Sequence, residues 1–87
     1  MRIKEGYVLC ESAGNNIVFR EEKGVRSAGV LGLNDTGALL WKMLEQESDP
    51  AALALRLCRD FGITPERAKQ DVIAYLRMLI GAGVVEE

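Results

Sequence analysis

Side chains of the types that catalyse reactions or bind metals are few in this sequence, and their spacing implies no site. The chain has no histidine, which removes the most common general base and a frequent transition-metal ligand. Cys10 and Cys58 are far apart and form no metal-binding motif, so we interpret them as buried, reduced thiols. Glu45, Glu47 and Asp49 flank a junction between two expected helices, where a solvated turn is the simpler interpretation. We therefore expect no catalytic residue, metal or cofactor, and we do not expect an enzyme.

A binding surface is better supported, and its main sign is a helix with two apolar stripes. At about 100° per residue, one face of the helix that follows Pro65 is apolar and is expected to enter the core. That face comprises Ala68, Val72, Tyr75 and Leu79, with Leu76 at its margin.

The second stripe lies on another side of the same helix. Ile73 and Ile80 fall together there, next to the cations Lys69 and Arg77. The stripe is either one wall of a groove for a peptide with aliphatic and acidic residues, or part of a broader buried face with a solvated cationic rim. Met78 lies on the opposite shoulder, and we interpret it as a packing residue.

Strand signals occupy the first third of the chain. Residues 7–10, 17–19 and 29–33 are expected strands, because they are apolar, β-branched or aromatic. Residues 13–16 contain Gly and Asn and should form the turn between the first two strands. Residues 20–28 are polar and contain a glycine, so a loop or an irregular strand start is expected there.

Helix signals begin at Asn34, a favourable N-cap, and Asp35 follows in the first turn. The expected helix ends within residues 45–48. Its apolar face has the spacing of one helical side, and the tryptophan on it is interpreted as a core residue. That face comprises Gly37, Leu40, Trp41 and Leu44.

Two more helices have clear start and stop signals. Asp49 caps the second helix, Pro50 is its first residue, and Gly62 ends it. Thr64 starts the third helix, which should end near Gly83. The two valines that follow are expected to fold back onto the core. Three strands followed by three helices predict an α+β fold with a three-stranded antiparallel sheet that keeps an open edge.

Composition limits the classes of partner. The 87 residues, of which 48% are hydrophobic, are expected to form a single domain, residues 1–87. The net charge of −2 gives no general attraction for nucleic acid or anionic membranes. No segment is apolar and long enough to span a bilayer, and the N-terminal residues do not resemble a signal peptide. A cytoplasmic location is therefore expected, with neither nucleic acid nor membrane as a partner.

Three segments of the chain form a recognisable combination. They are Gly6-Tyr7-Val8-Leu9, then Leu33-Asn34-Asp35-Thr36-Gly37 with Trp41, then the run from Asp71-Val72 through Leu76 and Leu79 to Gly83-Val84-Val85. Together they resemble the PqqD family, the small peptide chaperones also called RiPP precursor peptide recognition elements. The match is strongest at the junction 33–37, since family members commonly have Asn-Glu-Thr-Gly where this chain has Asn-Asp-Thr-Gly.

The resemblance implies a winged-helix-like, non-catalytic domain for natural product biosynthesis. Family members bind the leader segment of a ribosomally synthesised precursor peptide as an added strand, in the cleft beside the third helix. They present it to a modifying enzyme, often a radical-SAM enzyme. An open edge also makes a homodimer plausible. The peptide-binding residues expected here are Gly29, Val30, Leu31, Gly32, Leu33, Lys69, Ile73, Arg77 and Ile80.

The alternative is a winged-helix regulator that binds DNA. The segment from Leu57 through Phe61, Gly62, Ile63 and Thr64 resembles the turn of a helix-turn-helix motif. The exposed start of the following helix, however, mixes acidic and basic residues over 66–71. Contacts with phosphates normally require a basic stripe, so peptide binding is the favoured function.

Overall fold

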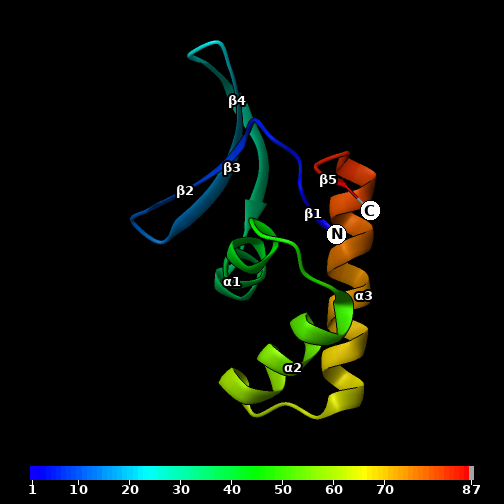
Figure 1. The fold of residues 1–87 in the computed structure, drawn as a ribbon. Coiled ribbons are helices and arrows are strands. Elements are labelled where there is room, and N and C mark those ends of the chain that lie inside the picture. Colours follow the sequence, from blue (N-terminus) through cyan, green and yellow to red (C-terminus); the bar gives the residue numbers. More distant parts are fainter. Residues whose placement is uncertain (87) are drawn as a thin grey trace.

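The computed structural model describes residues 1–86 and has a sheet at one end and helices at the other (Figure 1). The sheet is antiparallel with the strand order β2-β3-β4. The predicted α+β arrangement of three strands followed by three helices is confirmed. The elements of this main body are β2 (Tyr7–Ser12), β3 (Asn15–Glu22), β4 (Val25–Leu33), α1 (Asp35–Leu44), α2 (Pro50–Phe61) and α3 (Pro65–Ala82).

Of the two alternatives expected for residues 20–28, the loop is wrong and the irregular strand start is confirmed, because β3 continues to Glu22 and β4 begins at Val25 with irregular pairing. Lys23 and Gly24 have φ values of 53° and 79°, so they form the tight two-residue turn of a long hairpin. Arg26 pairs with Glu21 across the strands at 2.9 Å, and its guanidinium lies 5.2 Å from the ring centre of Phe19. Cross-strand contacts of this kind stabilise a hairpin without the hydrophobic alternation that a sequence pattern detects.

The helix boundaries follow the expected capping residues. Asn34, Asp49 and Thr64 each accept a hydrogen bond from a backbone N–H in the first turn of α1, α2 and α3. Gly62 and Gly83 end α2 and α3 in the left-handed conformation, with φ values of 64° and 73°. The predicted caps are therefore confirmed, and α1 ends one residue before the expected range.

The two ends of the described chain meet in a short strand pair that the sequence did not reveal. β1 (Arg2–Ile3) pairs antiparallel with β5 (Val85–Glu86), and the Lys4 N–H donates to the Val84 carbonyl at 2.9 Å. Val84 and Val85 are buried, which confirms that they fold back onto the core. This pairing fixes the C-terminal end of α3 beside the first residues of the chain.

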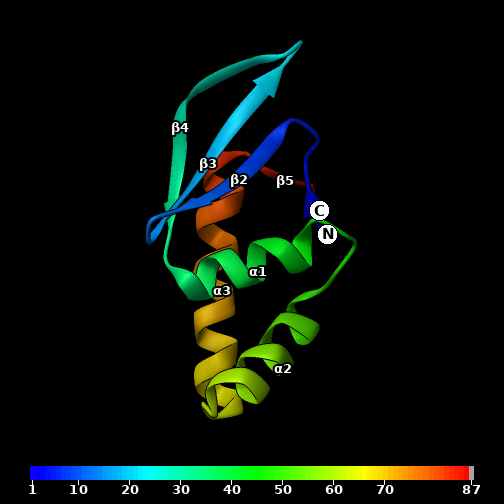
Figure 2. The same cartoon turned by 90° about the vertical axis from the view of Figure 1, so that its left-hand side faces the viewer.

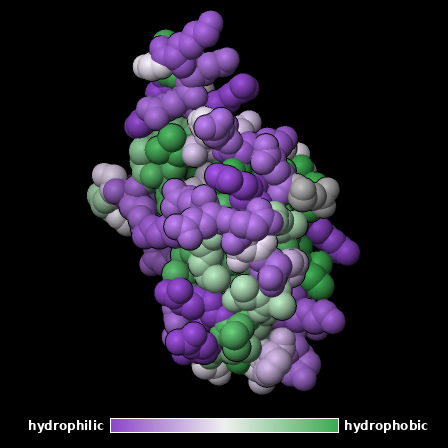
Figure 3. Space-filling model, viewed as in Figure 1, coloured by the Kyte–Doolittle hydropathy of each residue, from purple (hydrophilic) through white to green (hydrophobic). Residues whose placement is uncertain are grey.

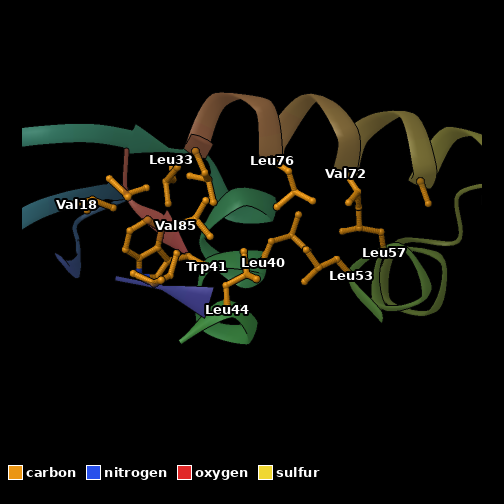
Figure 4. Close-up of a cluster of buried hydrophobic side chains, with 14 residues drawn as sticks. Val18, Leu33, Leu40, Trp41, Leu44, Leu53, Leu57, Val72, Leu76 and Val85 are labelled. Carbon is orange, nitrogen blue, oxygen red and sulfur yellow. The ribbon is translucent and has the colours of Figure 1, made fainter. Parts of the chain in front are cut away.

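One hydrophobic core joins the sheet to all three helices (Figure 4). Trp41 is fully buried, as predicted, and it lies near Val18 and Val85 at the end of the core that faces the sheet. Leu57 and Val72 fill the other end, between α2 and α3. Burial of this apolar surface packs α2 against α3 and joins both helices to α1 and the sheet through the shared core. Within residues 1–86, no helix is long and apolar enough to cross a membrane.

Candidate functional site

β4 is an edge strand, and its free side is the first part of the candidate site. In the described part of the chain, β4 pairs with β3 alone. Its last three residues, Leu31, Gly32 and Leu33, stand opposite Val18, Ile17 and Asn16 in a regular register. An edge strand has backbone N–H and C=O groups that can pair with another chain. The expected segment, residues 29–33, therefore lies where such pairing is possible.

Irregular pairing interrupts β4 on the N-terminal side of these three residues. Phe19 stands opposite Gly29 and Val18 opposite Leu31, so Val30 has no partner on β3 and forms a bulge. A second irregularity lies between the pairs Phe19–Gly29 and Glu21–Arg26. Bulges bend a strand and interrupt its edge. The straight stretch of free edge next to the helices is therefore Leu31 to Leu33.

A hollow of about 280 Å³ separates the end of β4 from α3, and we call it the β4–α3 cleft. β4 contributes Gly32 and Leu33 to its wall, and Gly37 lies at the start of α1. The α3 wall consists of Ala74, Tyr75 and Met78. In Figure 2, β4 lies on one side of α3 and α2 on the other, so this cleft follows a single flank of the helix.

Tyr75 and Gly37 join the two walls of the cleft. The Tyr75 hydroxyl donates a 2.7 Å hydrogen bond to the Gly37 carbonyl, and burial raises the pKa of Tyr75 well above its usual value. A Cβ at Gly37 would lie 3.1 Å from Asn34 Oδ1 and 3.3 Å from Tyr75 Cε1. The glycine at this junction thus allows α1 and α3 to approach closely, which sets the width of the cleft.

Asn16 fixes the end of β4 from the opposite side. Its Nδ2 donates to the Leu33 carbonyl and to Asp35 Oδ1, both at 3.1 Å, and its side chain is buried. The turn expected over residues 13–16 is wrong at Asn16, which lies in β3. Its role as a buried bridge between β3 and the strand-to-helix junction depends on register, which the residue type alone does not reveal.

The predicted helix residues do not all lie at this cleft. Lys69 and Ile73 line a larger hollow between α2 and α3, of about 710 Å³, which we call the α2–α3 groove. Ile73 and Ile80 are exposed, at 39% and 43%, so the second stripe lies outside the core. Arg77 is also exposed. Whether these four residues bind the same peptide as β4 stays a prediction.

Met78 lies at the cleft, and its interpretation as a packing residue is wrong. Its side chain is 41% exposed and lines the hollow. The available signal was its position three residues after Tyr75, on the flank opposite Ile73. Tyr75 itself is only partly buried, and Leu76, which we had placed at the margin, is in the core.

The two cysteines are partly exposed, so the expectation of buried thiols is wrong in degree. Both are free, and the Cys10 thiol accepts a hydrogen bond from Arg26 Nη1 at 3.3 Å. Cys58 lines the α2–α3 groove. Over residues 1–86, no cluster of three or more His, Cys, Asp or Glu side chains has the geometry of a metal site.

Comparison with solved structures identifies the fold. The chain superposes on TbiB1 in complex with the TbiA(beta) leader peptide with a TM-score of 0.77 and 20% identity, covering 99% of this chain and 95% of that one. It superposes on lasso peptide synthetase B1 complexed with the leader peptide with a TM-score of 0.73 and 21% identity, covering 99% and 96%. No curated protein matches the chain.

Comparison with protein families gives a match over most of the sequence. Residues 17–85 match the family described as Coenzyme PQQ synthesis protein D (PqqD). The matched region runs from β3 through the junction at Gly37 to the start of β5, and so includes both walls of the β4–α3 cleft. On this evidence the chain belongs to the PqqD family.

Proposed function

We propose that this protein binds the leader segment of a ribosomally synthesised precursor peptide and presents it to a modifying enzyme. The observation that carries the proposal is the free edge of β4 directly beside the β4–α3 cleft. A strand edge supplies backbone hydrogen bonds, and an adjacent hollow supplies selection of side chains. Membership of the PqqD family and a fold shared with two chains solved with leader peptides support it.

The leader adds to β4 along residues 29–33, with the straight stretch from Leu31 to Leu33 as the centre of pairing. Alternate side chains of an added strand point to one face, so one in two enters the cleft. Tyr75 and Met78 then form the apolar floor on which these side chains pack. The domain itself contributes binding and orientation, and the chemistry belongs to the enzyme, for which a radical-SAM enzyme is the first candidate.

Met78→Asp tests this placement, with Ile73→Asp as the matched variant. The two side chains are 41% and 39% exposed, on opposite flanks of α3, so both variants should fold. A charge in the apolar contact should weaken leader binding by at least about 30-fold, or ~2 kcal/mol, in Met78→Asp alone. Calorimetric titration with the leader peptide, alongside a thermal melt of each variant, gives the result.

The opposite outcome has a clear meaning. If Ile73→Asp loses the leader while Met78→Asp keeps it, the peptide uses the stripe of Ile73 and Ile80, as the sequence first suggested. If neither variant changes binding, the leader does not contact α3 in either place, and the proposed cleft is wrong.

A further inference from the structure

The α2–α3 groove has a volume of about 710 Å³, and it lies outside the proposed leader path. Ala51, Ala54, Leu55 and Cys58 form its α2 wall, at the spacing of one helical face. Lys69 and Ile73 stand on the α3 wall. Hydrophobic residues reach the surface over α2 in Figure 3, whereas the tip of the β3–β4 hairpin is hydrophilic. Leu55 is 60% exposed, which is high for a leucine packed beside other apolar residues.

The walls of this groove suit a helix better than a strand. Both walls are helices, whose backbone groups are already hydrogen-bonded, so an extended peptide would find no edge to pair with. Two packed helices leave a furrow into which the side-chain ridge of a third helix fits. Ala51, Ala54 and Cys58 are small, and small residues let a partner helix approach closely.

The charges around the groove specify the partner further. Arg56 and Arg67 are paired with Asp60 and Asp71, at 2.7 and 3.1 Å. Lys69 is the charged residue among those that line the groove, and within residues 1–86 no carboxylate pairs with it. An ammonium group beside an apolar wall attracts a carboxylate more strongly than one in open water. The complementary surface is therefore a helix with aliphatic side chains and one acidic residue.

We propose that the α2–α3 groove binds an amphipathic, acid-bearing α-helix of the modifying enzyme, a partner whose existence rests on the proposed function. α3 forms one wall of each hollow, with the β4–α3 cleft on one flank and the groove on the other. The leader and the enzyme helix thus contact different flanks of α3 and do not compete for the same surface. This arrangement places the peptide at a fixed distance from the enzyme that modifies it.

The first test uses two synthetic helical probes titrated into the ¹⁵N-labelled chain. Both carry leucines at positions i, i+4 and i+7, and they differ by one Glu or Lys beside the leucines. The Glu probe should shift the amides of Ala51, Ala54 and Cys58 and bind about 3- to 5-fold more tightly than the Lys probe. Lys69→Glu should reverse that preference. If the amide resonances of these three residues do not shift at millimolar concentrations of the probe, the proposal is overturned.

The second test uses Leu55→Arg, with Val25→Arg as its control. Both residues are highly exposed, at 60% and 70%, and Val25 lies on the hairpin away from the groove. Leu55→Arg should lower the affinity for the Glu probe by at least about tenfold, and Val25→Arg should leave this affinity unchanged. The purified enzyme that modifies the same leader should show the same pattern. An enzyme that binds Leu55→Arg normally overturns the assignment to the enzyme.

Three further outcomes separate this inference from the proposed function. Saturation with leader peptide should leave probe binding unchanged, and competition between them would mean that the groove is part of the leader path. A concentration-dependent dimer that Leu55→Arg disperses would mean that a second copy occupies the groove. A wild-type chain that binds the probe but no leader would overturn the proposed function and leave the helix site standing.

Discussion

Gly37 shows how one residue in a short motif sets the geometry of a binding cleft. Its missing side chain lets Tyr75 approach, and its carbonyl accepts the Tyr75 hydroxyl. Asn34 caps the same turn by accepting the Gly37 N–H at 2.7 Å. The sequence identified the cap from residue type, because capping depends on local backbone geometry. The contact with Tyr75 joins residues 38 positions apart, and no local pattern could reveal it.

Replacing Gly37 with Ala should therefore lower stability, although alanine is the better helix former. The higher helix propensity of alanine stabilises the folded chain by up to about 1 kcal/mol, whereas forcing a methyl group into a tight contact costs about 1–3 kcal/mol. With the full helix preference subtracted, we expect a net loss of up to about 2 kcal/mol in the free energy of unfolding. Chemical denaturation of the variant measures it.

Gly81→Ala is the matched control, because Gly81 lies in α3 with nothing within 4 Å of an added Cβ. It should stabilise the protein by about 0.5–1 kcal/mol. If Gly37→Ala stabilises the chain to the same extent, the close approach of Gly37 and Tyr75 does not constrain the fold.

At the scale of elements, helices were predictable and the long hairpin was not. Caps such as Asp49 and stops such as Gly62 are local signals, so the boundaries of α2 and α3 followed from residue types. β3 and β4 extend beyond the core as far as the turn at Lys23, where solvent surrounds both faces. Hydrophobic alternation is absent there because neither face is buried. The position of the edge strand was predicted correctly, since residues 29–33 lie in β4, and their pairing with a peptide stays a prediction.

An N-methyl scan of the leader peptide tests β4 as a pairing strand. Methylation removes one backbone N–H at a time, and only every second N–H of an added strand points toward β4. Binding should weaken by about fivefold at alternate positions, from the loss of roughly 1 kcal/mol per hydrogen bond. The intervening positions serve as internal controls. Uniform effects along the peptide would argue against strand addition.

At the scale of the whole molecule, α3 connects every part of the proposed function. It packs on the sheet, on α1 and on α2 through the shared core, and each flank borders a different hollow. The sequence predicted two faces for this helix correctly, and the structure shows that Ile73 borders the α2–α3 groove whereas Met78 borders the β4–α3 cleft. Periodicity shows that Ile73 and Met78 lie on different sides of α3. Which side faces β4 depends on how the helix packs, and the tertiary fold decides that.

The charge of the molecule predicts weak binding to duplex DNA. The net charge is −2, and near the start of α3 Arg67 is paired with Asp71. A recognition helix without a basic stripe releases few counterions from DNA. Fluorescence anisotropy at about 150 mM salt should show no saturation in the sub-micromolar range. Tight binding under these conditions would revive the winged-helix regulator.

Hydrogen exchange of the backbone amides, measured by NMR with and without leader peptide, tests the pairing with β4 most directly. Free-edge amides in β4 should exchange slowly only when the peptide adds a strand, so we expect new protection within residues 29–33. β2, the other edge of the three-stranded sheet, provides the internal comparison and should be unchanged. Protection that appears on β2, or no new protection on β4 at saturating leader, would contradict the account.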